Sequence, residues 1–401
     1  MRIHFITSKL KSPDKAGGSV IEIDFMMREM IRLGHEVTAV TLFSGNNDKN
    51  LIAPYKIIEE NIKSPRWYSI QRATLDTLRK YEERADVFVL DGQFIHGAGF
   101  YKFRGGRTPV AVYMIRPPLV KENYVSDLFV NPIERFYPGN LFRKLKYILR
   151  YLVERYVLSI VASHVNLVLC TNPMLLNEHL KFGLVPAKRG LVIGEPYPIE
   201  KTMKEAGIDE NYYSSKTGQD KEVIVYCTGR MVPGKGYDLL LTAFVKLRNK
   251  NYKLILGGSG PEEPLIRDMV KKLKLEDKVE FSGWVTREKL REYLKRVDIY
   301  VLAKWGSPNL SVISLIEVLS YGVPPIVPSG TALSWQMGKA ALTFTPDDPD
   351  SLAETIEKLG ADVELRRTQS RAGYDQLRNS SIDPRQTMLA MEIALKKLIQ
   401  A

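Results

Sequence analysis

Residues 222–247 read EVIVYCTGRMVPGKGYDLLLTAFVKL. A run rich in β-branched residues, Val223–Thr228, leads into a glycine-rich loop, and an apolar periodic segment begins at Tyr237. This order predicts a buried strand, a tight loop and a helix, the repeating unit of a doubly wound α/β fold. Open α/β sheets bind ligands at the carboxyl ends of their strands, so we expect a ligand at this loop.

The loop comes within one residue of the phosphate-binding pattern G-x-x-x-x-G-K-[ST]. Gly229 and Lys235 fit the pattern, but Gly236 stands where a hydroxyl is required to ligate Mg²⁺. Pro233 removes one amide of such a cradle, and Arg230 adds a second cation. Two cations at a glycine turn favour a clamp for a diphosphate, with a plain turn carrying two solvated cations as the alternative.

The same alternation of short apolar runs and amphipathic segments continues through all 401 residues, a length that predicts two domains. The runs are mostly continuous, as in strands buried on both faces of a parallel sheet. A polar stretch from about Pro196 to Lys221 predicts a linker between two sheets of five or six strands each. The predicted strands are Ile3–Thr7, Glu36–Thr41, Val87–Asp91, Val110–Ile115, Val165–Thr171, Val223–Thr228, Lys253–Gly257, Val279–Ser282, Ile299–Leu302, Pro325–Val327 and Leu342–Thr345.

Composition limits the choice of partners. Lysine and arginine exceed aspartate and glutamate by 58 − 46 = 12, which favours an anionic partner. Only two cysteines occur, Cys170 and Cys227, and both are expected to be buried thiols. We find neither a signal peptide nor a transmembrane segment, so we expect a cytoplasmic protein. A nucleic-acid partner is not expected, because no recognised nucleic-acid module appears.

Three motifs in the second half occur together in one order and spacing. They are GRMVPGKGYDLLLTAF (229–244), KLILGGSGPEEPLIRDMVKKLKLEDKVEFSGWV (253–285) and SLIEVLSYGVPPIV (314–327). Together they resemble the C-terminal half of retaining family 4 glycosyltransferases (glycosyl transferases group 1), which have the GT-B fold. More loosely, residues 12–41 and 167–193 resemble the first half of that family.

The resemblance implies a fold of two Rossmann-like doubly wound domains with a cleft between them. Residues 1–197 would form an acceptor-binding domain, and residues 198–383 a sugar-nucleotide-binding domain. The final helix, 384–401, would pack back onto the first domain.

The implied activity is retaining transfer of a sugar, expected to be a hexose, from a UDP- or GDP-sugar to an acceptor hydroxyl. The acceptor would be a glycan or a lipid-linked glycan, as in polysaccharide biosynthesis, and the reaction would need neither a metal nor another cofactor. The alternative is a weak or inactive GT-B protein that binds a sugar nucleotide or an anionic membrane surface.

The resemblance also implies catalytic residues. Arg230 and Lys235 would stabilise the leaving nucleoside diphosphate, since preorganised donors at a developing charge are large catalytic contributors. The family histidine near the donor sugar has no clear counterpart here. His96 and Arg116 are the two candidates for its place.

A second set of residues would bind the donor. Asn309 replaces the first glutamate of the family's E-x7-E segment, near the transferred sugar, whereas Glu317 matches the second, which binds the ribose hydroxyls. The remaining positions would contribute mainly backbone. The set comprises Gly17, Gly18, Gly229, Gly258, Gly260, Asn309, Val312, Ile313 and Glu317.

Two further stretches carry alternative interpretations. Asp348-Pro349-Asp350 superficially resembles a D-x-D metal motif, but its context predicts an acidic N-cap followed by a helix, so no metal site is expected. Residues 140–158 form an amphipathic basic helix, with an apolar stripe and a face carrying Arg143, Lys146 and Arg150. This helix either lies on an anionic membrane surface or packs on the core with a solvated basic face.

Overall fold

The computed structural model describes residues 1–12, 18–62, 64, 66–115, 145, 148–149, 152–216, 222–248, 251–303, 313–378 and 382–400. These residues form two compact units. Unit 1 comprises the described residues up to Tyr197 together with those from Asp383 onward. Unit 2 comprises the described residues from Pro198 to Ile382.

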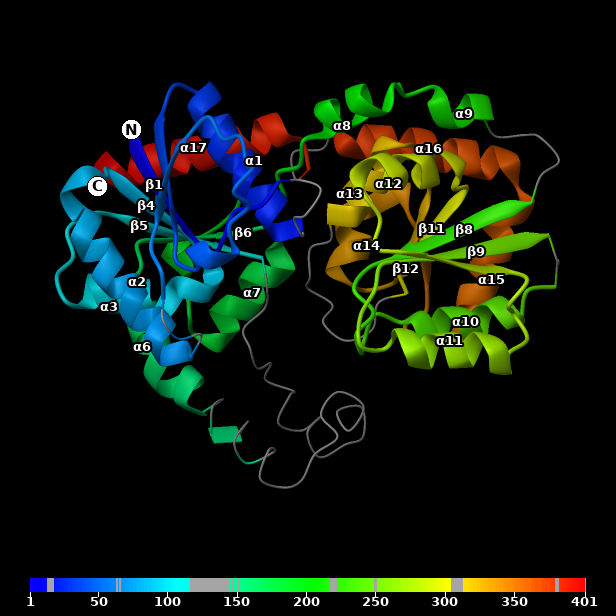
Figure 1. Ribbon diagram of the computed structural model, residues 1–401, viewed down its shortest axis with the longest axis horizontal. Helices are drawn as coiled ribbons and strands as arrows, with labels where there is room; N and C mark the ends of the chain where they lie inside the picture. The colour runs from blue at the N-terminus through cyan, green and yellow to red at the C-terminus, as the bar shows by residue number, and fades with distance from the viewer. Residues whose placement is uncertain are drawn as a thin grey trace. The chain divides into compact units, whose positions relative to one another are not determined.

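Unit 1 is built on a parallel sheet with the strand order β3-β2-β1-β4-β5-β6-β7. Figure 1 labels β1, β4, β5 and β6 of this sheet. Its strands are β1 (Arg2–Thr7), β2 (Glu36–Thr41), β3 (Lys56–Glu59), β4 (Val87–Asp91), β5 (Val110–Met114), β6 (Leu167–Cys170) and β7 (Gly190–Val192). Its helices are α1 (Gly18–Arg32), α2 (Trp67–Tyr81), α3 (Ile95–Phe103), α6 (Ser159–Ala162), α7 (Pro173–Phe182) and α17 (Pro384–Gln400), and a π-helical turn, η5 (Glu154–Leu158), precedes α6.

The sheet of unit 1 is covered on both faces, and its central strands β1, β4 and β5 are almost entirely buried. One core joins the sheet to α1 and α17, through residues such as Met27 and Met391. The other joins it to α2, α3, α6 and α7, through residues such as Leu78 and Phe182. His35, at the turn from α1 to β2, has its Nε2 2.9 Å from Oε1 of Glu392 on α17.

Unit 2 is built on a second parallel sheet, with the strand order β10-β9-β8-β11-β12-β13. Its strands are β8 (Val223–Thr228), β9 (Tyr252–Gly257), β10 (Val279–Gly283), β11 (Ile299–Val301), β12 (Pro325–Pro328) and β13 (Leu342–Phe344). Its helices are α8 (Ile199–Ala206), α9 (Tyr212–Lys216), α10 (Tyr237–Val245), α11 (Glu263–Lys272), α12 (Arg287–Arg296), α13 (Ile313–Ser320), α14 (Ala332–Met337), α15 (Pro349–Ala361) and α16 (Val363–Leu377).

Strand β8 occupies the centre of this sheet and determines where a ligand site can form. The chain passes from β8 outward to β9 and β10, and then returns to place β11 on the other side of β8. The strand order therefore reverses between β8 and β11, and such a switch point leaves a crevice at the carboxyl ends of the strands.

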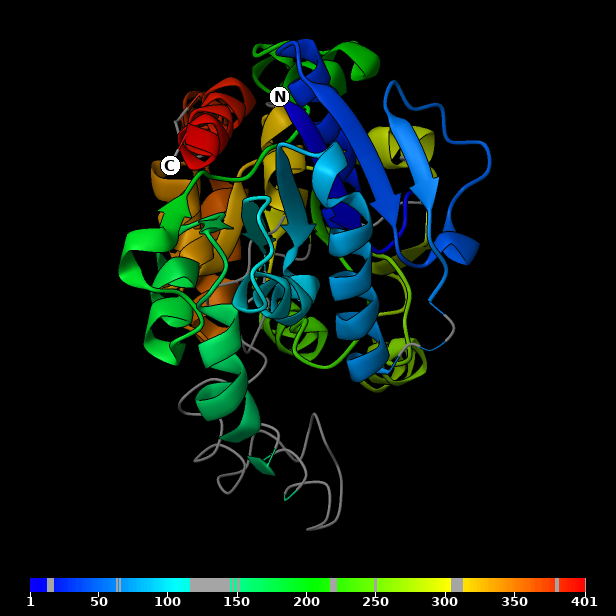
Figure 2. The same ribbon diagram turned by 90° about the vertical axis from the view of Figure 1, so that its left-hand side faces the viewer.

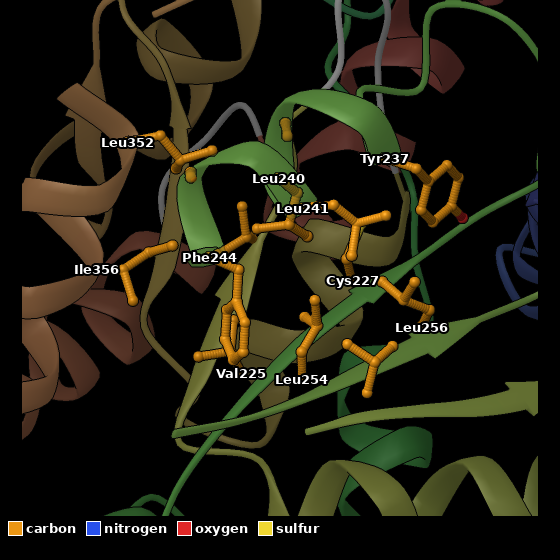
Figure 3. Packing of buried hydrophobic residues seen from close by; sticks show 14 of the residues in the cluster. Val225, Cys227, Tyr237, Leu240, Leu241, Phe244, Leu254, Leu256, Leu352 and Ile356 are labelled. Carbon is orange, nitrogen blue, oxygen red and sulfur yellow. The ribbon is translucent and has the colours of Figure 1, made fainter. Parts of the chain in front are cut away.

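The core of unit 2 fixes the position of the loop that follows β8. Val225 and Cys227 of β8 pack against Leu240 and Phe244 of α10, together with side chains of β9 and α15 (Figure 3). All four side chains are at most 4% exposed. Since both the strand and the helix are anchored in one core, the loop between them is held at both of its ends.

The predicted fold class is confirmed, with corrections in detail. The structure adds two strands that the sequence did not suggest, β3 and β7, so the unit 1 sheet has seven strands among the described residues. Both are short and lie at the edges of the sheet, with half-exposed side chains, so they lack the continuous apolar run used to find the others. The stretch predicted as a linker, from about Pro196 to Lys221, contains the short helices α8 and α9.

The two cysteines and the acidic motif agree with their simpler interpretations. Cys170 and Cys227 are free and buried, and burial raises the pKa of each thiol to about 12. Asp348 caps α15, its carboxylate accepting hydrogen bonds from the amides of Asp350 and Ser351. Among the described residues, no group of three or more histidine, cysteine, aspartate or glutamate side chains is arranged to hold a metal ion.

Candidate functional site

The loop between β8 and α10 lies at the switch point of the unit 2 sheet. Gly236 caps α10 in the left-handed conformation, with φ +75°. A Cβ atom at this position would lie 1.8 Å from the carbonyl oxygen of Ala303. The serine or threonine of a P-loop is therefore excluded here by backbone packing as well as by the backbone conformation.

A second glycine turn, after β9, packs directly on this loop. A Cβ at Gly258 would lie 2.1 Å from the carbonyl oxygen of Gly229, and one at Gly260 would lie 2.2 Å from that of Met231. The Met231 amide donates to the Ser259 carbonyl at 2.9 Å. Such close backbone contacts are possible only because Gly258 and Gly260 have no side chains. The turn after β9 and the β8–α10 loop therefore pack backbone against backbone, and we call the two together the glycine layer.

Most amides of the β8–α10 loop are already used within the protein. The Gly229 N–H donates to the Gly257 carbonyl, and the Lys235 N–H to the Val232 carbonyl. Those of Met231 and Val232 also have carbonyl acceptors. Pro233 has no N–H, so this loop offers a phosphate far fewer amide donors than a P-loop does.

Tyr237, the first residue of α10, holds the two loops together. Its buried hydroxyl donates toward the carbonyl oxygens of Gly229, at 2.8 Å, and Gly257, at 3.2 Å. Burial raises the pKa of this phenol far above its usual range, so it remains a donor at all physiological pH values. The sequence analysis did not predict this role of Tyr237. The feature that could have indicated it is an aromatic residue with a hydroxyl at the start of the helix that follows the loop.

The two cations that the sequence singled out lie on this layer. Arg230 is exposed, whereas Lys235 is largely withdrawn beside Gly229, with its Nζ 3.8 Å from the position that a Cβ of Gly229 would occupy. Burial lowers the pKa of Lys235. Among the described residues, neither side chain forms an ion pair with a carboxylate. The layer therefore presents two positive charges that an anion can neutralise.

Helix α13 brings Glu317 to the same end of the sheet. The Tyr300 hydroxyl of β11 lies 3.1 Å from Ser314 Oγ in the first turn of α13 and 3.5 Å from the Thr228 carbonyl at the end of β8. Glu317, half-buried one turn later, contributes to raising the pKa of Tyr300, whose main cause is burial. The sequence analysis missed Tyr300, which couples the start of α13 to the end of β8.

The positions of the other predicted site residues differ. Ile313 begins α13, and Gly18 begins α1 of unit 1 as an exposed residue. His96 is buried in α3, its ring 5.5 Å from that of Trp67 in an edge arrangement. Gly17, Arg116, Asn309 and Val312 lie outside the described residues.

Unit 1 has a polar cluster of its own at the carboxyl ends of its strands. The Tyr113 hydroxyl of β5 donates to Oε1 of Glu22 on α1, and both side chains are buried. Burial raises the pKa of Glu22, and the nearby charge of buried Glu195 raises it further. The sequence analysis missed this cluster, because a single glutamate in an otherwise apolar helix stripe gives no sign of its partners.

Two doubly wound parallel sheets, each the core of its own unit, define an α/β protein of two Rossmann-like units. The whole chain resembles solved structures of this architecture. Sucrose-phosphate synthase from Thermosynechococcus elongatus matches with a TM-score of 0.72 at 17% identity, covering 100% of this chain and 99% of that one. Anabaena HepE, solved in complex with UDP, matches with a TM-score of 0.68 at 14% identity, covering 98% and 100%.

A family match lies within the second unit. Residues 209–376 match the profile of Glycosyl transferases group 1, and the fold is that of GT-B glycosyltransferase structures, which confirms the resemblance seen in the motifs. The mannosylfructose-phosphate synthase of Agrobacterium fabrum is 28% identical over 213 residues, 47% of this chain and 46% of the relative. LpsD of Rhizobium meliloti, a lipopolysaccharide core biosynthesis glycosyltransferase, is 31% identical over 157 residues, 39% and 44%. The match thus spans less than half the length of either relative.

Proposed function

We propose that the protein is a glycosyltransferase that moves a sugar, with retention of anomeric configuration, from a UDP- or GDP-sugar to an acceptor hydroxyl. The observation that supports this most directly is the pair Arg230 and Lys235 on a glycine layer at the switch point. Both lack a carboxylate partner among the described residues, and a diphosphate is an anion that would supply one.

The reaction follows from what these groups can hold. The bond from the sugar C1 to the diphosphate oxygen breaks, and its electron pair goes to that oxygen. The acceptor oxygen bonds to C1 on the same face, and its proton passes to the leaving diphosphate. Arg230 and Lys235 would stabilise the charge that grows on the diphosphate, so that the transfer needs no metal ion.

The remaining donor contacts would come from α13. Glu317 has two carboxylate oxygens that can accept hydrogen bonds from a vicinal diol, which suits the ribose. The start of α13, next to the end of β8, adds partial positive charge near the phosphates. The acceptor would be a glycan or a lipid-linked glycan, bound through unit 1. The UDP complex of HepE and the lipopolysaccharide role of LpsD are consistent with such substrates.

Calorimetric titration with UDP, GDP and ADP in the presence of EDTA tests the proposal. We expect one of the three nucleotides to bind the parent, and Arg230→Ala to remove that binding. The matched control is Arg371→Ala, on α16, whose exposed guanidinium has no ion-pair partner among the described residues. Binding that is absent in EDTA and appears only when Mg²⁺ is supplied in its place, or binding that survives Arg230→Ala unchanged, would contradict the metal-free clamp.

A further inference from the structure

Exposed apolar side chains line the segment of unit 1 that runs from Leu152 through η5 into α6; part of the helix predicted over residues 140–158 lies outside the described residues. These side chains form adjacent pairs that recur every four residues, which places them on one face of the segment. Each is between 40 and 64% exposed. We name as the apolar stripe Leu152, Val153, Tyr156, Val157 and Ile160.

The stripe is not needed for the core of unit 1. The opposite side of the same segment already packs inward through Leu158, Ser159 and Ala162, each at most 8% exposed. In both views the segment from Leu152 to Ala162 extends beyond the layered body of unit 1 (Figures 1 and 2). A second, outward apolar face of this size is uncommon on a soluble surface and indicates a binding surface.

A basic pocket adjoins the carboxyl end of the stripe. A cavity of about 470 Å³ is lined by Ser163, His164, Pro186, Lys188 and Arg189, with no carboxylate among them. It is connected to the stripe because His164 Nδ1 lies 2.7 Å from the Ile160 carbonyl oxygen. His164 of the basic pocket thus lies one turn after Ile160, the last residue of the stripe, and Lys188 and Arg189 line the same cavity. The Arg189 guanidinium is held there by hydrogen bonds from its Nη1 to the carbonyl oxygens of Ser163 and Val165.

Further cations and an aromatic ring border the two features. Phe103, exposed at the end of α3, lies 5.1 Å from the His164 ring. Arg155 of η5 donates to the Lys181 carbonyl and lies over the Phe182 ring. From Leu152 to Leu191, all of them described residues, the sequence has four lysines and arginines against two glutamates, a net charge of 4 − 2 = +2.

Three kinds of occupant could cover an apolar face, and the charge distinguishes them. A second copy of the chain would place its own positively charged surface against this one, and the two like charges would repel each other. A neutral protein surface would leave the basic pocket without a partner. An anionic bilayer satisfies both features, because apolar side chains enter the acyl boundary while aromatic and basic residues remain at the headgroups.

We propose that the apolar stripe and the basic pocket together form a docking surface for an anionic phospholipid bilayer. The stripe enters the boundary of the acyl chains, and Lys188, Arg189 and His164 bind headgroup phosphates. The proposal goes beyond glycosyl transfer and does not depend on it, because docking is measured without any donor sugar.

Sedimentation with vesicles tests the surface. The parent is mixed with vesicles of phosphatidylcholine alone, or of phosphatidylcholine and phosphatidylglycerol in equal amounts. We expect binding to the anionic vesicles only. Tyr156→Glu combined with Ile160→Glu is expected to weaken it by more than about 100-fold, since two apolar side chains no longer leave water. Lys188→Glu is expected to weaken it by at least about fivefold, from the loss of one surface cation.

Matched controls separate docking from general changes of charge or stability. Leu389→Glu combined with Ile393→Glu makes the same change at two exposed apolar residues of α17. Lys49→Glu makes the same reversal at an exposed lysine elsewhere in unit 1. Both are expected to bind vesicles like the parent.

Three outcomes would overturn the proposal. Equal binding to neutral vesicles would remove the role of the basic pocket. Equal losses in the controls and in the stripe variant would show that net charge alone decides binding. Self-association of the parent in the absence of lipid, lost in the stripe variant, would assign the surface to a second copy of the chain.

Discussion

Replacing Gly236 with serine would restore the hydroxyl of a P-loop, and the geometry predicts that unit 2 cannot accept it. The residue has φ +75°, where a side chain costs about 1–2 kcal/mol. The new Cβ would also lie 1.8 Å from the Ala303 carbonyl oxygen. Forcing neighbouring backbone apart adds about 1–3 kcal/mol. The free energy of unfolding should therefore fall by about 2–5 kcal/mol in total.

The loss is measurable by scanning calorimetry of the unit 2 transition. For a domain of this size, about 1 kcal/mol corresponds to about 2–4 °C, so Gly236→Ser should lower Tm by about 4–20 °C. The matched control is Gly330→Ser, because Gly330 has φ +68° but nothing within 4 Å of its would-be Cβ. This control should show only the conformational part, about 1–2 kcal/mol.

The comparison isolates the contact with Ala303. If Gly236→Ser and Gly330→Ser lower Tm equally, close packing against Ala303 is refuted as the reason for glycine at position 236. If Gly236→Ser retains its Tm and gains Mg²⁺-dependent nucleotide binding, the loop is a P-loop after all, and the interpretation as a cation clamp is wrong.

Further predictions concern the clamp and its surroundings. Arg230→Ala or Lys235→Ala should each lower the transfer rate by at least about 100-fold, with Lys271→Ala, an exposed lysine of α11, as the control; an activity within threefold of the parent would exclude the clamp. Because burial lowers the pKa of Lys235, nucleotide affinity should fall as pH rises from that lowered pKa toward the ordinary 10.5, whereas Lys235→Arg should lose this dependence in a calorimetric pH series. The free energy of unfolding changes in the opposite direction. Between the lowered pKa of Lys235 in the folded state and 10.5, the unfolded state binds one more proton than the folded state, so stability rises with pH. Asn309→Glu, which restores the family carboxylate, should change turnover or donor preference in a donor screen, and unchanged kinetics would place Asn309 away from the sugar.

The strands that the sequence predicted well are those buried on both faces. Runs such as Val223–Thr228 and Val87–Asp91 could be predicted as strands from their own residues, because a short, mostly apolar run is typical of a strand buried on both faces of a parallel sheet. By contrast, β3 and β7 are edge strands with half-exposed side chains. They are held in the extended conformation by pairing with β2 and β6, respectively. Their apolar runs are short, such as Ile57-Ile58 of β3, and such short runs also occur in loops.

The sequence could indicate candidate site residues where charge and local pattern coincide. Arg230 and Lys235 were proposed because two cations flank a glycine loop after a strand, and the structure places both at the switch point of unit 2. Tyr237 and Tyr300 were not, because their importance lies in hydrogen bonds to carbonyl oxygens and to a hydroxyl that the chain brings close only after folding. A local sequence pattern can show the charge of a site. It cannot show which backbone amides and carbonyls remain available to a ligand after folding.

In the proposed clamp, cations would replace the amides that bind phosphate in a P-loop, and hydrogen bonding within the loop gives the physical reason. An amide that already donates to a carbonyl of the protein cannot also donate to a phosphate. In this loop the amides that donate to protein carbonyls are those of Gly229, Met231, Val232 and Lys235. The internal bonds tie the loop to the turn after β9 and so give it rigidity. Binding of a diphosphate then has to come from side chains, which is the task that Arg230 and Lys235 can perform, and a rigid loop lets them do so with little reorganisation as the leaving group acquires charge.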